Sequence, residues 1–396
     1  MRIDLTENGD PVDVEIGERV GSALRNSGVV TATPALPHGW WTIGPAGKVG
    51  VAQVAGIELW VKPKLDTRRL FFLLGFASDH KVWRDDDLGL VEDADLLSAI
   101  ATAFARQADK ATQQGLLQGY RVEEDALPVL RGRVRSAEQL SRRYGLVIPL
   151  EVRFDEYGVD IPENQLLRGA AEVLLKLPGI GSRTRKLLLR LVRSMADVTP
   201  ARRGRSKPLW HASRLNTRYH LALRLAELVL RGGSVEQKSG EVMVNGFLLD
   251  MAKVFEDFLT VTLGSALTAY EGHCKTQDRW YFDEAEEIKM RPDLVWYRKD
   301  GSVGAVVDAK YKAEKPSGYP YADLYQMLAY CTALKLPQGH LVYAKGNEPA
   351  AGHLVRNAGI EIVQHAIDLH LLPHSLMAQV EMLARTISAT DPAPAA

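Results

Sequence analysis

The sequence predicts a multidomain α+β protein with an N-terminal β-rich and helical module, a central helical region and a C-terminal mixed α/β domain. Three observations predict this class. Short apolar runs broken by Gly and Pro fill the first 63 residues, which is typical of small β modules. Apolar residues then recur at three- and four-residue spacing, which indicates helices. The last third alternates helix, strands, helix and strand, and this order is typical of a mixed sheet.

The predicted modules have boundaries in polar, Gly-bearing stretches. We assign residues 1–160 to the N-terminal module and residues 161–240 to a helical linker region. Residues 241–385 form the mixed α/β domain, and residues 386–396 form a disordered tail rich in Ala and Pro. The polar segment 231–241 supports the boundary before the last domain.

Several elements follow from the local pattern. Residues 1–63 predict mostly antiparallel strands, and helices follow from Thr67. Between residues 120 and 160, two strand-like pieces flank the polar, helix-prone stretch SAEQLSRR. Helices dominate from Gln165 to Arg231.

A β-hairpin is predicted in the stretch RPDLVWYRKDGSVGAVVDAKYK. Its two apolar runs, 294–297 and 303–307, are separated by a polar segment that contains Asp300-Gly301, a strong signal for a two-residue turn. With those two residues in the turn, cross-strand partners have numbers that add to 601. Asp293 then lies opposite Asp308, with Cβ atoms roughly 5 Å apart.

Three charged side chains converge in that hairpin. Alternation along a strand places Lys310 on the same face as Asp308. Two facing carboxylates, Asp293 and Asp308, repel each other unless a cation neutralises them, and Mg²⁺ prefers carboxylate oxygens. The pattern therefore predicts a Mg²⁺ site that hydrolyses phosphodiesters, with Lys310 as a catalytic side chain. The alternative is a solvated hairpin with charges on its outer face.

The helices expected at about 246–268 and 320–335 carry further candidates. Glu256 is predicted as a third acidic group, both catalytic and metal-binding. Three other acidic residues compete for that role: Glu241, Asp250 and Asp257.

In the second helix, Gln326 and Tyr330 are four residues apart on one face, where they can reach a phosphate or orient the lysine. The alternative for this pair is a solvated helix edge. Lys312 and Lys315 are candidates for contact with a nucleic-acid backbone, and a solvated loop explains them equally well.

Composition excludes several classes. The 49 basic and 49 acidic residues give a formal net charge of zero, so nucleic-acid affinity must come from local basic patches or from a partner. Cys274 and Cys331 belong to no CxxC motif, and HExxH is absent, so a zinc site is not predicted. The sequence lacks a P-loop, and it has no apolar leader or membrane-length run, so a cytoplasmic protein is expected.

One basic segment has two interpretations. LPGIGSRTRKLLLRLV, residues 177–192, resembles a helix-hairpin-helix, in which a Gly-rich turn offers backbone amides to a phosphate. An ordinary turn between helices with a glycine cap is the preferred interpretation.

The chain as a whole resembles the McrC family, the nuclease subunits of McrBC-type modification-dependent restriction systems. The resemblance rests on residues 130–170, on GFLLDMAKVFEDFL (246–259), on RPDLVW with VVDAKYK, and on DLYQMLAYC. It implies a PD-(D/E)xK nuclease domain in which Asp293, Asp308 and Lys310 match the catalytic motif and Glu256 is the preceding helical acid. The first 120 residues match only in general character.

The resemblance also implies partners. Such subunits join a hexameric McrB-like AAA+ GTPase, stimulate its GTP hydrolysis and cut double-stranded DNA that carries modified cytosine. GTP would be bound by the partner and Mg²⁺ by this chain; no membrane partner is expected. Within the N-terminal module, residues 1–160, the candidates for contact with the motor are the β module and residues 120–160. Two alternatives are a stand-alone metal-dependent repair nuclease and a non-catalytic adaptor of an AAA+ motor.

Overall fold

The computed structural model describes most of the chain, and its contacts divide it into two compact units. Unit 1 comprises Met1–Ala94 with Leu248–Ala396, and unit 2 comprises Asp95–Phe247. This division differs from the predicted boundaries near residues 160 and 240, because the N-terminal strands group with the C-terminal domain. The described residues are 1–78, 95–144, 146–201, 208–232, 244–311, 321–344 and 351–389.

The first 62 residues supply two small sheets, with strand orders β1-β6-β5-β10 and β2-β4-β3; β10 (Val244–Asp250) is added to the first from later in the chain. Their elements are β1 (Arg2–Thr6), β2 (Val12–Glu15), α1 (Glu18–Ser27), β3 (Val30–Ala35), β4 (Trp40–Pro45), β5 (Lys48–Val54) and β6 (Ile57–Lys62), followed by α2 (Thr67–Ser78). β1 and β6 pair in parallel, whereas β2 with β4, β3 with β4 and β5 with β6 pair antiparallel. The prediction of strands and of the helix at Thr67 is confirmed, but α1 was not predicted. A Cβ on Gly21 of α1 would overlap the Trp41 ring, so this helix lies very close to its sheet.

The helix predicted from residue 246 begins later. Residues Val244–Asp250 form strand β10, and α9 spans Met251–Leu267. The prediction was wrong for its first turn because Phe247, Leu248 and Leu249 are consecutive buried residues, a pattern that fits a strand as well as a helix. Asp250 caps α9, since its carboxylate accepts hydrogen bonds from the main-chain N–H groups of Ala252 (3.0 Å) and Lys253 (3.2 Å).

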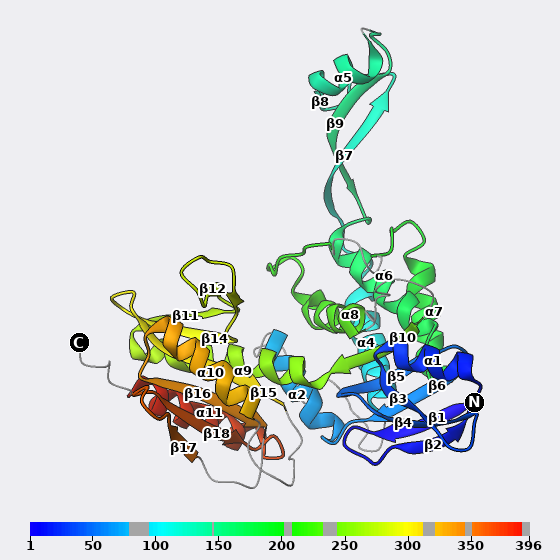
Figure 1. Cartoon of the computed structure of the whole chain (residues 1–396). Coiled ribbons are helices and arrows are strands. Elements are labelled where there is room, and N and C mark those ends of the chain that lie inside the picture. Colours follow the sequence, from blue (N-terminus) through cyan, green and yellow to red (C-terminus); the bar gives the residue numbers. More distant parts are fainter. Residues whose placement is uncertain are drawn as a thin grey trace. The chain divides into compact units, whose positions relative to one another are not determined.

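The C-terminal domain is built on a mixed sheet with strand order β11-β14-β15-β16-β18-β17 (Figure 1). Helix α10 packs on one face, where Met327 and Cys331 join a buried cluster with Val306 and Leu341. Its remaining elements are η2 (Thr268–Tyr270), β11 (Gly272–Thr276), β12 (Trp280–Tyr281), β13 (Lys289–Met290), β14 (Leu294–Arg298), β15 (Val303–Lys310), α10 (Tyr321–Leu334), β16 (Gln338–Ala344), β17 (Ala351–Leu354), β18 (Glu361–Ile367) and α11 (Pro373–Ser388). The prediction of a mixed α/β order is confirmed. The predicted tail begins too early, since α11 runs to Ser388; residues 390–396 lie outside the described part.

The hairpin between β14 and β15 differs from the predicted two-residue turn. The Arg298 N–H donates to the Ser302 carbonyl (2.9 Å), so three residues form the loop, with Gly301 at φ +84°. Pairing then shifts between Trp296 and Tyr297, leaving Gly304 as a bulged residue. The longer loop and the bulge offset each other. Leu294 therefore still pairs with Val307, whose numbers add to 601 as predicted.

Unit 2 is a helical body from which an arm extends (Figure 1). The body contains α4 (Leu96–Thr112), α6 (Pro162–Leu175), α7 (Ser182–Ser194), η1 (Thr217–Tyr219) and α8 (His220–Gly232). The arm is a sheet of order β7-β9-β8 with one helix: β7 (Gly119–Leu127), β8 (Arg133–Val134), α5 (Ser136–Arg143) and β9 (Leu150–Gly158). Both the strands flanking SAEQLSRR and the later helices confirm the prediction. Within the described residues, no helix is long and apolar enough to span a bilayer.

Candidate active site

Asp293 and Asp308 lie at the end of the β14–β15 ladder. Their neighbours Leu294 and Val307 form the terminal pair of the two strands, which puts the two aspartates opposite each other one position further out. Cross-strand partners share a face of the sheet. The Asp293 carboxylate also accepts a hydrogen bond from the Ala309 N–H (2.8 Å), which ties it to the residue beside Asp308.

Burial and nearby negative charges raise the pKa of both carboxylates. Burial, and then the charge of Asp308, raise the pKa of Asp293 to about 7, against the hydrogen bond from Ala309. Burial also raises the pKa of Asp308, which is 3% exposed, while Lys310 opposes this rise. A cation placed between them would allow both to ionise, and perturbed acids of this kind are typical of functional sites.

Lys310 is held by groups from two elements. It forms an ion pair with Asp308 from its own strand, and its ammonium donates to Gln326 Oε1 on α10 (2.9 Å). Asp323, one turn before Gln326, lies 3.8 Å from the same ammonium. The Gln326 side-chain amide in turn donates to the Tyr330 hydroxyl (2.7 Å), and burial raises the pKa of Tyr330 to about 12, so this phenol remains protonated. Gln326 and Tyr330 therefore form a chain that fixes the position of Lys310.

Glu256 reaches the pair through an amide. The Gln277 side-chain N–H₂ donates to Glu256 Oε1 (2.9 Å) and to Asp293 Oδ1 (2.9 Å). Lys253 also donates to Glu256 Oε1 (2.7 Å), on the outer side of α9. The charge of Glu256 contributes to the raised pKa of both Asp293 and Asp308. The predicted helical acid thus lies beside the pair, joined to it by one side chain.

The donor set fits a hard divalent cation. Mg²⁺ takes one or two carboxylates, keeps several waters and accepts oxygen ligands only. Asp293 and Asp308 supply two carboxylates whose mutual repulsion such an ion would remove. Among the described residues, no group of three or more His, Cys, Asp and Glu side chains is gathered closely enough to hold a metal as it stands. Glu256, at the far side of the Gln277 amide, is accordingly a group that assists the two aspartates.

The other predicted candidates have different positions. Asp257 forms an ion pair with Lys253 (3.0 Å) on the α9 surface, and Asp250 is the helix cap described above, so neither lies in the site. Glu241, Lys312 and Lys315 lie outside the described residues.

Two members of the cluster were missed in the sequence. Gln277 follows strand β11 and adopts φ +51°, an uncommon conformation for a non-glycine residue. Asp323 is buried on α10, where the Tyr343 hydroxyl donates to it (3.4 Å). Asp323 is three residues before Gln326 in the sequence, so the helical spacing that indicated Gln326 and Tyr330 also indicates Asp323.

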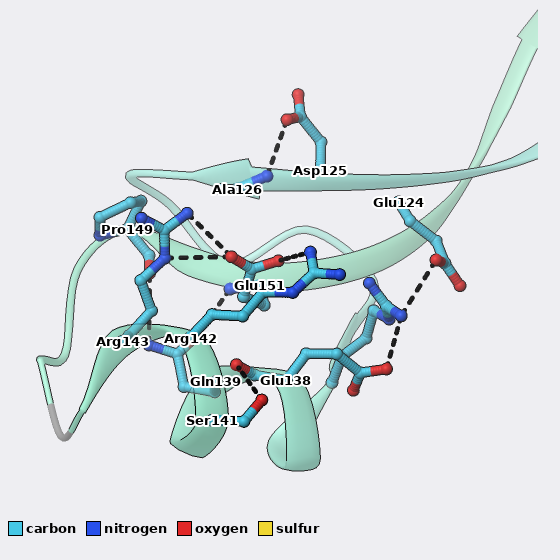
Figure 2. A network of polar contacts seen from close by, with 11 residues as sticks. Glu124, Asp125, Ala126, Glu138, Gln139, Ser141, Arg142, Arg143, Pro149 and Glu151 are labelled. Carbon is cyan, nitrogen blue, oxygen red and sulfur yellow. Dashed lines mark hydrogen bonds and ion pairs between the residues drawn. The ribbon is translucent and has the colours of Figure 1, made fainter.

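The arm of unit 2 is a second candidate site, and its end is held by a network around Glu151 (Figure 2). Glu151 is 4% exposed, and its carboxylate forms ion pairs with Arg143 (2.8 Å) and Arg142 (3.7 Å) from α5. Its main-chain N–H donates to Gln139 Oε1 (2.6 Å), so α5 is fixed on β9. Arg135 adds ion pairs to Glu138 and Glu124.

This rigid end carries apolar side chains that point to solvent. Tyr144 is 91% exposed, Val147 75% and Leu140 71%. Other apolar residues of the arm end are also exposed: Val129, Leu130, Leu146 and Ile148. An exposed apolar group of this size on an ordered support is typical of a protein-binding surface.

Comparisons with known proteins were made for the whole chain. A family model described as "McrBC 5-methylcytosine restriction system component" matches residues 45–344, more than half of the chain. No curated protein matches. The chain is similar to McrC in a half-complex from a tetradecameric assembly of Thermococcus gammatolerans McrB AAA+ hexamers, with 18% identity, 98% of this chain and 100% of that chain covered, and a TM-score of 0.61. A cryo-EM structure of the Thermococcus gammatolerans McrBC complex is also similar, with 21% identity, 67% of this chain and 88% of that chain covered, and a TM-score of 0.40.

Proposed function

The chain belongs to the McrBC family of 5-methylcytosine restriction system components, and we propose from this premise that it is the subunit that hydrolyses DNA phosphodiesters. The observation that carries the proposal is the facing pair of the half-buried Asp293 and the buried Asp308 beside Lys310. Their order, Pro-Asp on one strand and Asp-x-Lys on the next, supports a PD-(D/E)xK nuclease domain.

In the proposed mechanism, Asp293 and Asp308 hold Mg²⁺ and Glu256 assists. A bound Mg²⁺ supplies positive charge that allows both aspartates to ionise and polarises the scissile phosphodiester. The Lys310 ammonium orients the attacking water and stabilises the charge that develops on the phosphate in the transition state. Gln326 and Tyr330 keep that ammonium in place through the hydrogen bonds described above.

The test is Asp308→Ala in the full chain, assayed with its AAA+ partner on DNA containing 5-methylcytosine. We expect cleavage to fall by about 100- to 1000-fold, as for loss of a principal charge-stabilising group, while stimulation of the partner's GTP hydrolysis is unchanged. If the complex that carries Asp308→Ala cleaves DNA at the wild-type rate, the proposed site is rejected, and a non-catalytic adaptor is supported if that cleavage comes from another chain. Cleavage by the purified wild-type chain without GTP or partner would support a stand-alone nuclease instead.

We also propose that the arm end binds a McrB-like AAA+ GTPase hexamer. The similar Thermococcus gammatolerans chain is bound to such hexamers, and the exposed Leu140, Tyr144 and Val147 provide an apolar surface on a rigid support. Burial of two or three such side chains contributes about 1.5–3 kcal/mol each.

A charged arm end tests this assignment. Leu140→Glu with Val147→Glu should abolish stimulation of GTP hydrolysis by the hexamer. The matched control is Leu354→Glu with Leu372→Glu, two exposed leucines of unit 1, which should leave stimulation intact. Equal stimulation by both double variants would exclude the arm end as the contact.

A further inference from the structure

Helix α7 carries an unusually uniform charge. Its thirteen residues, SRTRKLLLRLVRS, contain five basic side chains and no acidic one, although the whole chain has equal numbers of each. The neighbouring helices α4, α6 and α8 each mix both signs, as in LLSAIATAFARQADKAT. A helix whose outer face only has to be solvated needs no single sign, so the composition of α7 calls for a different explanation.

The basic side chains form one stripe. At 3.6 residues per turn, Arg183, Lys186, Arg190 and Arg193 lie within a sector of about 80° and span about 15 Å of helix. The buried residues of α7, which include Leu188 and Leu191, lie on the opposite side. All four basic residues of the stripe are exposed.

Among the described residues, most of this charge has no ion-pair partner. Arg190 forms an ion pair with Asp109 and remains 64% exposed. Within the part of the chain that the structure describes, Arg183, Lys186 and Arg193 form no ion pair. Three cations held on a rigid support without counter-charges repel one another and raise the local potential, which attracts an anionic partner.

The start of the helix adds main-chain N–H groups, which also favour an anionic ligand. Gly179 adopts φ +79° in the turn before α7, and Gly181, the cap residue, offers no side chain to the first-turn N–H groups. These amides point out of the helix at its positive end, on the exposed residues Ser182 and Arg183. The stripe and the helix start thus favour the same ligand, a row of phosphates.

We propose that the α7 stripe is a DNA-binding surface of this chain that contacts the backbone of duplex DNA without reading its sequence. The inference rests on the proposed function for the choice of DNA as the polyanion. Phosphates follow one another along a strand at intervals that a 15 Å row of cations can match, and each phosphate contact releases counterions. The surface accounts for how a chain with zero net charge holds its substrate.

The test is the triple variant Arg183→Gln, Lys186→Gln, Arg193→Gln in the full chain. Binding to an unmodified 30-base-pair duplex is followed by fluorescence anisotropy in EDTA, so that no cleavage occurs, between 50 and 200 mM salt. Three lost phosphate contacts reduce the slope of log affinity against log salt by about 2.7. Over this fourfold change in salt, binding of the wild type should therefore weaken about 40-fold more than binding of the variant.

The matched control neutralises three exposed basic residues of unit 1: Arg19→Gln, Lys62→Gln, Lys335→Gln. It has the same net charge as the α7 variant, and its salt slope should equal that of the wild type. Equal slopes for all three proteins would overturn the proposal. So would an α7 variant that binds DNA normally but no longer joins the AAA+ hexamer, since the stripe would then be a protein interface. Because binding is read without catalysis, failure of the proposed cleavage would appear separately, as a wild type that binds but never cuts.

Discussion

The facing carboxylates predict a specific link between pH, metal and stability. In the metal-free protein the pKa of Asp293 is about 7, against an ordinary value of 3.8. The folded protein therefore retains a proton that the unfolded chain releases, so stability declines as pH rises from about 4 to about 7. The free energy of unfolding falls by about 1.4 kcal/mol per pH unit over about three units. Above pH 7, ionised Asp293 therefore lowers the free energy of unfolding by about 4 kcal/mol.

Asp308→Asn removes part of this cost. Burial is the largest cause of the raised pKa and the charge of Asp308 is the second, so we expect the variant to regain less than half, about 1–2 kcal/mol, at pH 8 in EDTA. In the wild type, Mg²⁺ should raise the thermal midpoint, and more at pH 8 than at pH 5.5, because protons compete with the metal. In Asp308→Asn this rise should disappear.

The measurement is thermal unfolding from pH 5 to 8, in EDTA and in Mg²⁺. Asp300→Asn is the matched control, since Asp300 lies in the loop of the same hairpin and accepts hydrogen bonds from Ser302 in that loop. It should behave as the wild type in both buffers. A Mg²⁺-induced rise that persists in Asp308→Asn, or that does not depend on pH in the wild type, would refute the reasoning.

Three further predictions concern other contacts. Gln277→Leu releases the two carboxylates that the amide joins, and it should raise the Mg²⁺ concentration needed for half-maximal cleavage about 10-fold, the lower end for lost outer partners of a metal site. Gly132→Ala would put a Cβ 2.2 Å from the Arg153 carbonyl, at φ +72°; hydrogen exchange should report an opened arm while the midpoint of unit 1 is unchanged. Burial lowers the pKa of His340 to about 3 and of His365 to about 4, so both stay neutral and each costs about 2 kcal/mol as pH falls from 6.5 to 5. His340→Leu should reduce that acid loss in urea unfolding, and an unchanged loss would contradict it.

The hairpin illustrates what sequence reasoning could predict. Periodicity and the Asp-Gly signal located both strands and the relation between Asp293 and Asp308. The predicted length of the turn was wrong, but the bulge at Gly304 restored the predicted register. A Gly inside an apolar strand is a sign of such a bulge. The local pattern therefore predicted the pair for a reason that was only partly right.

Contacts between distant segments could not be predicted in the same way. Gln277 is 21 residues from Glu256 and 16 from Asp293, and nothing in its neighbourhood distinguishes it from a loop glutamine. The prediction of a helix from residue 246, where the structure has strand β10, failed for a related reason. Consecutive apolar residues have no periodicity that distinguishes a strand from a helix. The grouping of residues 1–94 with the C-terminal domain depends on long-range packing, which has no local signature.

The proposals place hydrolysis in unit 1 and both binding surfaces in unit 2, so mutations can separate them. Asp308 lies in unit 1, and the arm end and the α7 stripe lie in unit 2; substitutions that share no partners act additively on stability. The Mg²⁺-dependent rise of the thermal midpoint then reports an intact site in unit 1, even in a variant of unit 2. An arm variant that loses cleavage but keeps this rise has lost its partner. A variant that loses both cleavage and the Mg²⁺-dependent rise is misfolded, and its lost cleavage is no evidence for a contact.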